Sequence, residues 1–452
     1  MRDLKITLIG GGSYAWTPGI LANLLTNKRL NGSAIVLHDL NPEALDLTHR
    51  LGQVYLQRLG VDATIEHTTD QAAALDGADY VIVTISTGGL ETMRPDLEIP
   101  EKYGIFQTVG DTVGPGGLSR ALRNIPVFLR MARAMEQRCP KAWMLNLSNP
   151  LCAITRAVNK GTRIRALGLC HGVLGVAMEY AAFLGADIAE CAYVNTGIDH
   201  CSWFTDFRVR GRCMGDLLDD KGLDRWLSLS PAQAKEDPTF GKLYAFRCGF
   251  LLGRALGALP AIHDRHMVEF FPTFLQGEAN VAKYGLARTS VTDREGYYVA
   301  RRGRIERWLS GQEEIRLQAA DDVAGRRQSD DLGAWISALE GWTVFEDNLN
   351  APNIGQIPEL PLGPIVETRG LLDGAGYHPL ASPMPAQLQA VIRPHVARQD
   401  LTVEAAVEGS FDKALAVIAT DPLVEHVETA RPMLEALMAA NREWLPQFAP
   451  SS

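Results

Sequence analysis

Short apolar runs alternate with helical patterns along the first 195 residues of the chain. Runs long enough to form a buried strand occur at residues 4–9, 34–37, 80–85, 142–147 and 164–169. Strands that alternate with helices indicate a mostly parallel sheet with helices on both faces. We therefore predict an α/β domain built on a doubly wound parallel sheet over residues 1–195.

After His200 the pattern changes, because strand-like runs become rarer and helical stretches take their place. The helical stretches lie at about 240–257, 276–286, 293–309 and 403–446. They predict a second, α-rich or α+β domain over residues 196–452.

Two segments of the second domain lack a regular period. Residues 313–331 are rich in Gln, Asp and Arg, which predicts a mobile loop. Residues 348–362 are dense in Pro, Asn and Gly, which predicts an irregular connection.

The composition excludes several classes of partner. The 452 residues contain 44 Lys and Arg against 53 Asp and Glu, a net charge of −9, without a long basic cluster. Binding to the phosphate backbone of a nucleic acid is therefore not expected. No apolar stretch reaches the roughly 18 residues of a membrane span. The charged start Met1-Arg2-Asp3 does not resemble a secretory signal. We expect a cytoplasmic protein without a nucleic-acid or membrane partner.

The seven cysteines are odd in number and form no CxxC pair. This pattern matches neither a disulfide framework nor a structural zinc site. We predict that most of them are reduced, buried thiols, which agrees with a cytoplasmic location.

A glycine-rich turn, Gly10-Gly11-Gly12-Ser13, follows the first predicted strand, and Ala15 fills the last small-residue position of the G-x-G-x-x-G/A pattern. Such glycines let the backbone approach a pyrophosphate, which the N-terminus of the next helix stabilises. Asp39 ends the second predicted strand, where an acidic residue binds ribose hydroxyls and favours NAD over NADP. We predict a Rossmann-like NAD site; a purely structural turn is the alternative.

A second loop, Ser86-Thr87-Gly88-Gly89, follows the strand predicted at 80–85. Ligands of a doubly wound sheet gather at the carboxyl ends of its strands. Thr87 and Gly88 are therefore candidate cofactor contacts, although a simple strand-end turn would have the same sequence.

Cys170 and His171 come directly after the strand predicted at 164–169, and His200 follows a strand-like stretch at 192–198. A thiolate and an imidazole together can hold a divalent transition metal and leave positions open for substrate oxygens. Core packing of a neighbouring Cys–His pair is the alternative.

Polar residues also follow other apolar runs. Asp111 lies in a glycine-dense loop, Asn149 follows a run at 143–147, and Asp264-Arg265-His266 lies between apolar stretches. Each alone fits a turn, a cap or a surface charge. Together they give the arrangement that an active site on such a sheet requires.

In this order and combination, the motifs resemble those of glycoside hydrolase family 4. They are Gly10-Gly-Gly-Ser13, Gly110-Asp-Thr-Val-Gly-Pro-Gly-Gly117, Asn149-Pro150, Cys170-His171-Gly172, Gly197-Ile-Asp-His200 and Asp264-Arg-His266. The resemblance extends to about residue 424, nearly the whole chain. It implies a first domain like that of malate and lactate dehydrogenases, followed by a domain for substrate binding and oligomerisation. It also implies NAD and usually Mn²⁺ as cofactors, and a homodimer or homotetramer.

The resemblance implies roles for single residues around the metal. Cys170 and His200 would bind the ion, and Asn149 would contact substrate hydroxyls near it. Asp111 matches a loop acid close to the metal.

The implied mechanism differs from the usual pair of carboxylates. Hydride leaves C3 of the sugar for NAD⁺, and the metal stabilises the enolate formed when the C2 proton is removed. Asp264 is the expected base, with Tyr244 as the alternative, and His171 is the expected acid for release of the aglycone. Water then adds and the hydride returns to C3, so no net redox change occurs.

The residue after Cys170 separates the branches of the family. A His at this position resembles the members that act on non-phosphorylated sugars, and segments 103–117, 264–272 and 360–368 look most like the α-galacturonidases. Gly172 is instead similar to the α-glucuronidase and α-glucosidase members. Galacturonide and glucuronide therefore both stay open, with α-galactosides and α-glucosides as further alternatives.

A uronate carboxylate requires a cationic partner, and Arg265 or His266 could supply it. Alternatively, Arg265 only pairs with Glu269 or Asp264. The first domain alone also fits another class, an NAD-dependent 2-hydroxy-acid dehydrogenase, which would need no metal.

Overall fold

The computed structural model describes residues 3–315, 317 and 331–449. Most of the loop predicted at 313–331 lies outside these described residues. Among the helices within them, none is both long and apolar enough to cross a bilayer.

Six parallel strands form the core of the main sheet, in the spatial order β3-β2-β1-β4-β5-β6. This is the strand order of the Rossmann fold, so the predicted doubly wound parallel sheet is confirmed. The strands are β1 (Lys5–Ile9), β2 (Ala34–His38), β3 (Thr64–Thr68), β4 (Tyr80–Val83), β5 (Trp143–Asn146) and β6 (Arg165–Gly168).

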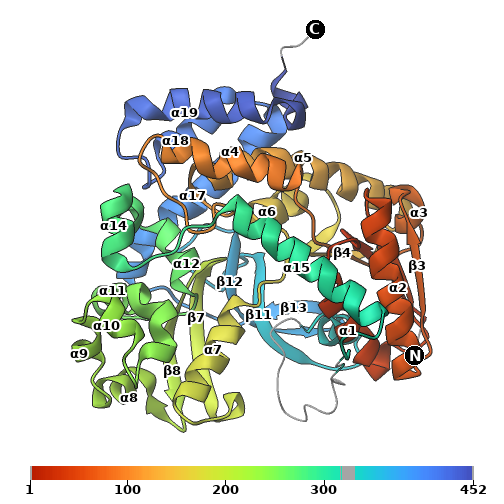
Figure 1. Cartoon of the computed structure of the whole chain (residues 1–452), viewed down its shortest axis with the longest axis horizontal. Coiled ribbons are helices and arrows are strands. Elements are labelled where there is room, and N and C mark those ends of the chain that lie inside the picture. Colours follow the sequence, from red (N-terminus) through yellow and green to blue (C-terminus); the bar gives the residue numbers. More distant parts are fainter. Residues whose placement is uncertain (1–2, 316, 318–330, 450–452) are drawn as a thin grey trace.

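The apolar runs of these strands are buried on both faces, because successive side chains point to opposite sides of a sheet. In β4, Tyr80 and Ile82 belong to one buried cluster, whereas Val81 and Val83 belong to the other. Helices cover each face (Figure 1). Those of the first half are α1 (Thr17–Thr26), η1 (Lys28–Leu30), α2 (Pro42–Leu59), α3 (Gln71–Leu75), α4 (Gly89–Glu101), α5 (Gly114–Arg138), α6 (Leu151–Gly161), α7 (Gly172–Phe183) and η2 (Ile188–Glu190).

Three antiparallel strands extend the main sheet beyond β6. They are β11 (Phe345–Pro352), β12 (Ile365–Asp373) and β13 (Gly376–Pro379), and β11 meets β6 where Asn350 pairs with Gly168. The prediction of an irregular connection from residue 348 is therefore wrong for the part that belongs to β11.

The Asn residues of β11 suggest a loop, but their side-chain amide groups donate hydrogen bonds inside the protein. Asn348 Nδ2 donates to the hydroxyl of Tyr193 at 3.1 Å, and Asn350 Nδ2 donates to Glu367 Oε1 at 3.0 Å. Buried polar residues with such partners are compatible with a central strand.

A second, smaller sheet follows the first six strands. It contains β7 (Cys191–Ile198), β8 (Cys201–Val209), β9 (Arg212–Cys213) and β10 (Leu259–Pro260), with β8 between β7 and β10. The turn between β7 and β8 contains only Asp199 and His200.

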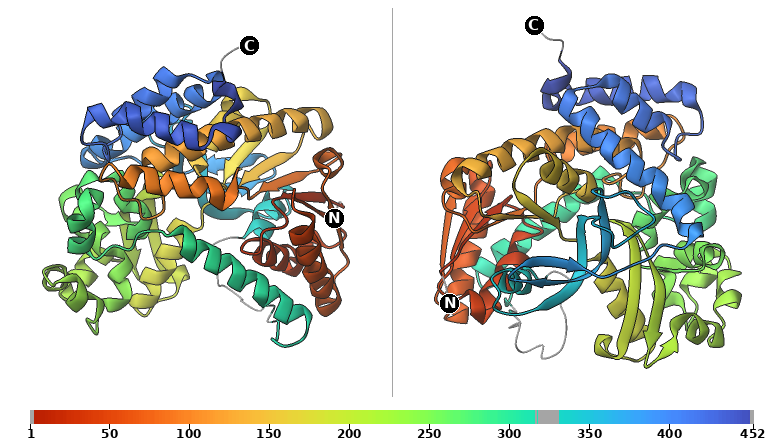
Figure 2. Two further views of the ribbon diagram at one scale, coloured as in Figure 1. Left: turned by 45° about the horizontal axis from the view of Figure 1, so that its top comes forward. Right: turned by 180° about the vertical axis from the view of Figure 1, so that it is seen from behind.

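Helices form most of the remaining chain, as the sequence predicts. The C-terminal stretch expected at 403–446 is divided: α17 ends before Gly409, which has φ +65°, and α18 and α19 follow it. The three helices cover α4 and α5 (Figures 1 and 2). The helices of the second half are α8 (Met214–Asp220), α9 (Leu223–Leu227), α10 (Pro231–Lys235), η3 (Gly241–Phe246), α11 (Arg247–Leu256), α12 (Asp264–Met267), η4 (Val268–Phe270), α13 (Pro272–Leu275), α14 (Gly277–Tyr284), α15 (Val291–Leu309), α16 (Leu332–Leu339), α17 (Ala386–Glu408), α18 (Phe411–Ala419), α19 (Val427–Ala440), η5 (Arg442–Trp444) and η6 (Pro446–Phe448).

Candidate active site

The glycine turn after β1 has the geometry of a dinucleotide cradle. The amides of Gly10 and Gly11 both donate to the carbonyl of His38, at 2.9 and 2.8 Å. Gly10 has φ +91°, and a Cβ at this position would lie 2.3 Å from the carbonyl oxygen of Thr84. Only glycine tolerates this conformation and this approach. The turn leads into α1, whose N-terminus favours an anion.

Asp39, at the end of β2, holds the glycine turn from the outside. One carboxylate oxygen, Oδ2, accepts the amide of Gly12 at 2.9 Å, and Oδ1 accepts the amide of Asn41 at 3.0 Å. Asp39 is half-buried. Each carboxylate oxygen can accept a second hydrogen bond, so Asp39 retains capacity for ribose hydroxyls.

The second predicted cofactor loop lies beside the first. The amide of Thr87 donates to Asn124 Oδ1 at 3.0 Å, and Asn124 Nδ2 donates to the carbonyl of Asn149 at 2.9 Å. The Thr87 hydroxyl is buried and has no hydrogen-bond partner among the described residues. Because buried hydroxyls are normally paired, this oxygen is suited to a polar group of a bound ligand.

His200 stands at the centre of two groups of metal-ligand atoms. Cys170 and Asp199 form one group with it, and Asp111 and His266 form the other. Within each group the ligand atoms lie within 4.8 Å of one another. The structure therefore brings together the two predicted ligands, Cys170 and His200.

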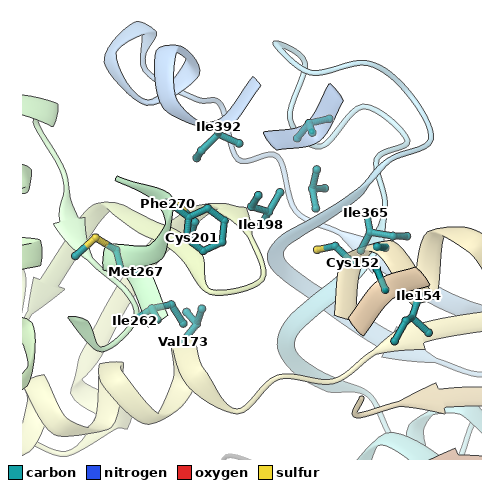
Figure 3. Packing of buried hydrophobic residues seen from close by; sticks show 14 of the residues in the cluster. Cys152, Ile154, Val173, Ile198, Cys201, Ile262, Met267, Phe270, Ile365 and Ile392 are labelled. Atoms are coloured by element: carbon teal, nitrogen blue, oxygen red, sulfur yellow. The ribbon is translucent and has the colours of Figure 1, made fainter. Parts of the chain in front are cut away.

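The tight turn between β7 and β8 fixes the position of His200. Its φ is +64°, in the left-handed region that non-glycine residues rarely adopt. Ile198 and Cys201, which flank the turn and pair with each other across it, pack in the same buried cluster as Phe270 (Figure 3). This packing holds the imidazole at the carboxyl ends of the parallel strands.

A hydrogen-bond chain connects His200 with two other predicted residues. The Thr112 hydroxyl lies 2.8 Å from His200 Nδ1 and donates to Asp111 Oδ1 at 2.7 Å. Asp111 Oδ2 accepts the side-chain amide of Asn149 at 3.1 Å. With Nδ1 engaged in this way, Nε2 is the imidazole atom left to bind a metal.

Burial and neighbouring charges shift the pKa values of two predicted site residues, Cys170 and Asp111, in opposite directions. Burial raises the pKa of the Cys170 thiol well above its usual value, and the negative charges of Asp199 and Glu367 raise it further. Burial also raises the pKa of Asp111, but the charges of His200 and Arg120 outweigh that effect and hold the pKa well below its usual range. A divalent cation would supply the charge that a Cys170 thiolate requires.

His171 lies at the opening of the site, at the start of α7. It is exposed, and its ring centroid lies 6.0 Å from the ring of Trp16, the residue that precedes α1. The charge of His171 is also close enough to lower the pKa of Asp199, although burial of Asp199 has the larger, opposite effect. His171 is thus placed between the cofactor cradle and the metal-ligand groups.

The side chains of the Asp264-Arg265-His266 motif point in different directions. The His266 ring lies 4.0 Å, centroid to centroid, from the His200 ring. Asp264 lies in neither metal-ligand group; its carboxylate accepts the amides of Cys248 and Gly249, at 2.7 and 2.8 Å, at the start of α11. Burial raises the pKa of Asp264 to about 7. The structure therefore directs the carboxylate of the expected C2 base at the start of α11, away from the ligand groups.

Tyr244, the alternative base, lies on η3. Its hydroxyl donates to the carbonyl of Gly285 at 3.4 Å, and burial raises its pKa. Neither this contact nor the metal-ligand groups connect Tyr244 to His200.

The alternative role of Arg265 is a structural ion pair with Glu269 or Asp264. Within the described chain, no salt bridge connects it with Asp264 or Glu269. Glu269 Oε1 instead accepts the amides of Val109 and Gly110, at 2.7 and 2.8 Å, and so fixes the loop that carries Asp111. Arg265 itself is exposed at the edge of the site.

The sequence did not indicate every residue of the site. Asp199 is 1% exposed, and both carboxylate oxygens are buried without a hydrogen-bond partner among the described residues. The sequence could have indicated Asp199, because it directly precedes His200 at the end of the strand-like stretch 192–198. His266, predicted to bind substrate, lies among the potential metal-ligand atoms. A hydroxyl in a glycine-dense loop has no distinctive sequence pattern, so the sequence does not indicate Thr112.

Comparison with protein families decides the class. The family 4 glycosyl hydrolase model matches residues 5–186, and the model for the C-terminal domain of the same family matches residues 195–424. The chain belongs to glycosyl hydrolase family 4. The predicted family is thereby confirmed. Membership of this family favours a glycoside hydrolase over the alternative class, an NAD-dependent 2-hydroxy-acid dehydrogenase.

Two curated family 4 relatives differ in substrate. The enzyme is 31% identical to an α-galacturonidase of Lachnoclostridium phytofermentans over 99% of this chain and 98% of the relative. It is 29% identical to an α-galactosidase of Rhizobium meliloti over 99% of this chain and 90% of the relative.

Solved structures have the same fold over nearly the whole chain. A candidate glucosidase from Bacillus subtilis, 27% identical, superposes with a TM-score of 0.84 over 97% of this chain and 100% of the other. A 6-phospho-α-glucosidase from gut microorganisms, in complex with NAD and Mn²⁺, is 20% identical and gives a TM-score of 0.80 over 98% and 99%. The latter likeness concerns the fold alone.

Proposed function

We propose that this family 4 enzyme is an NAD- and Mn²⁺-dependent α-glycosidase whose substrates are α-galacturonides or α-glucuronides. The observation that carries the proposal is the arrangement of two metal-ligand groups around His200, next to a dinucleotide cradle and an unneutralised Arg265. The α-galacturonidase relative supports the uronide.

The cofactor cradle fits NAD. The turn Gly10-Gly11-Gly12-Ser13 would hold the pyrophosphate, Asp39 the ribose, and Thr87 with Gly88 the nicotinamide half. The close approach at Gly10 and the unpaired Thr87 hydroxyl suit such a ligand. Bound NAD⁺ supplies reversible hydride acceptance from C3 of the sugar.

The ligand groups fit a divalent transition metal. Cys170 and His200 would bind it, and Asp199 adds a buried carboxylate. Mixed sulfur, nitrogen and oxygen donors suit such ions. The metal would supply Lewis-acid stabilisation of negative charge on sugar oxygens.

The remaining residues bind the sugar and move protons. Asn149, oriented by Asp111, would bind a sugar hydroxyl. His171, exposed at the opening, would donate a proton to the departing aglycone oxygen. The family pattern implies that Asp264 is the base. Its two contacts with backbone amides of α11 instead support a role in which Asp264 positions α12 against α11.

The test is a panel of nitrophenyl α- and β-glycosides, with and without a C6 carboxylate, assayed with Mn²⁺ and catalytic NAD⁺. We expect nitrophenol release from an α-uronide without net NADH. A stoichiometric rise at 340 nm from a free hydroxy acid, without nitrophenol, would overturn the glycosidase. Release from α-galactosides or α-glucosides alone would retain the glycosidase and reject the uronide.

A further inference from the structure

Two arginines from separate segments lie at the edge of the site. Arg265 belongs to α12, and Arg294 lies in the first turn of α15. Thr108 joins the two segments, because its hydroxyl donates to the carbonyl of Arg265 and its own carbonyl accepts the Thr289 hydroxyl at 2.5 Å. The start of α15 is therefore tied to the segment that carries Arg265 and His266.

The first turn of α15 is also fixed from its other side. Val291 packs against Met93 and Leu97 of α4, and Glu295 forms an ion pair with Arg94 of α4 at 3.2 Å. In Figure 1, α15 runs across the front of the molecule from this point towards α2.

Arg294 is less exposed than its neighbours in the first turn of α15. It is half-buried, whereas the preceding Thr292 and Asp293 and the following Glu295 and Gly296 are exposed. Its side chain is therefore partly covered by the rest of the protein, five residues after Thr289, whose hydroxyl contacts Thr108.

The positive charges of this pair are not neutralised. Among the described residues, neither Arg265 nor Arg294 forms an ion pair. Partial burial of the Arg265 side chain lowers its pKa, and the positive charge of Arg294 lowers it further. Arg288, a few residues before Arg294, instead forms ion pairs with Glu101 at 3.4 Å and Glu278 at 3.7 Å.

In the part of the chain that the structure describes, the nearest acids form hydrogen bonds with other groups and no ion pair with these two arginines. Asp111 accepts hydrogen bonds from Thr112 and Asn149, and Glu269 accepts two backbone amides. Two unpaired positive charges on adjoining segments disfavour each other unless an anion lies between them. This arrangement is suited to an anionic group of the ligand beside the metal-ligand groups.

We propose that Arg294 and Arg265 together form a carboxylate clamp that binds the C6 carboxylate of the glycone. Guanidinium groups bind carboxylates by paired, charge-assisted hydrogen bonds. The inference rests on the proposed function, since it assumes a uronide substrate. Arg294 then determines whether an acidic or a neutral sugar is preferred.

The experiment compares Arg294→Met with the wild-type holoenzyme on nitrophenyl α-galacturonide and nitrophenyl α-galactoside. Loss of a hydrogen bond to a charged group should reduce kcat/KM for the uronide roughly 10- to 100-fold, mainly through KM. The value for the galactoside should stay within about twofold, and Arg294→Lys should recover part of the uronide activity. Arg288→Met is the matched control, because it removes a neutralised arginine close by.

Three outcomes would overturn the clamp. An equal loss on both substrates would indicate a structural role for Arg294, and unchanged uronide kinetics would show that Arg294 does not touch the carboxylate. In both cases the proposed function would stand if the wild type cleaves the uronide. If the wild type cleaves only neutral glycosides, both the uronide and the clamp are rejected.

Discussion

The cofactor cradle and the metal-ligand groups are neighbours, but they are built in different ways. The cradle depends on the backbone of one continuous turn, Gly10-Gly11-Gly12-Ser13, and on one carboxylate at the end of β2. The ligand groups depend on side chains from four separate segments, centred on His200. A continuous backbone feature can be recognised in a sequence, whereas a convergent set of side chains exists only after folding.

The strongest test of this contrast removes a metal ligand while leaving the cradle intact. Cys170→Ser should lose Mn²⁺ binding and glycosidase activity, whereas NAD⁺ binding survives. Loss of an outer-shell partner already costs roughly 10–100-fold in metal affinity, so we expect a loss of more than about 100-fold. Titration calorimetry with Mn²⁺ and NAD⁺ separately would measure both. Cys191→Ser, at a half-buried thiol outside both ligand groups, is the control; full activity of Cys170→Ser would reject the ligand.

The converse change disrupts the cradle. Gly10→Ala forces a Cβ to within 2.3 Å of the Thr84 carbonyl and requires a left-handed alanine. We expect loss of NAD⁺ binding and a decrease of about 1–3 kcal/mol in the free energy of unfolding, measured by urea denaturation. Gly175→Ala in α7, where a Cβ would meet nothing within 4 Å, should be neutral or stabilising. Retained NAD⁺ affinity in Gly10→Ala would contradict the cradle.

A third change tests whether Asp264 is the base that removes the C2 proton or a structural residue that holds the start of α11. In Asp264→Asn one of the two amides at the start of α11 loses its acceptor. We expect the free energy of unfolding to fall by about 1–3 kcal/mol, while C2 proton exchange with deuterated solvent continues. Asp70→Asn, which changes an exposed helix cap of α3, should have little effect on either. Loss of exchange with unchanged stability would restore Asp264 as the base.

A fourth change concerns the acid that ties the Asp111 loop to η4. Burial raises the pKa of Glu269 to about 8 from a usual 4.5. The folded protein then holds a proton that the unfolded chain releases, so stability should decrease as pH rises between about 4.5 and 8. Glu269→Gln keeps an oxygen acceptor but cannot ionise, and should flatten this dependence in urea melts. The exposed control Glu278→Gln should leave the pH dependence of stability unchanged. The same unchanged slope in Glu269→Gln would contradict the predicted effect of Glu269.

The predictable part of the fold was the part with uninterrupted apolar runs. β1, β2, β4, β5 and β6 are buried on both faces, so their sequences are nearly continuous in apolar residues. β3, with the sequence Thr-Ile-Glu-His-Thr, was missed because it is an edge strand with exposed positions. β11 was missed because its asparagines are paired internally.

The predictable part of the site was similarly limited. Cys170, His200, Asp111 and Asn149 follow apolar runs or lie in a distinctive loop, and the structure brings them together. The directions of neighbouring side chains could not be read, because successive helical residues point about 100° apart. For that reason Asp264 faces α11 while His266, two positions later, faces His200.

The junction between β6 and β11 determines what happens if the two halves of the sequence are separated. A fragment ending near residue 195 would retain the cradle but leave β6 as an open edge, since β11 comes from the later half. Exposed edges of this kind recruit other chains, so such a fragment should aggregate rather than serve as an isolated NAD-binding module. A circular permutant that keeps both halves in one chain would preserve the pairing.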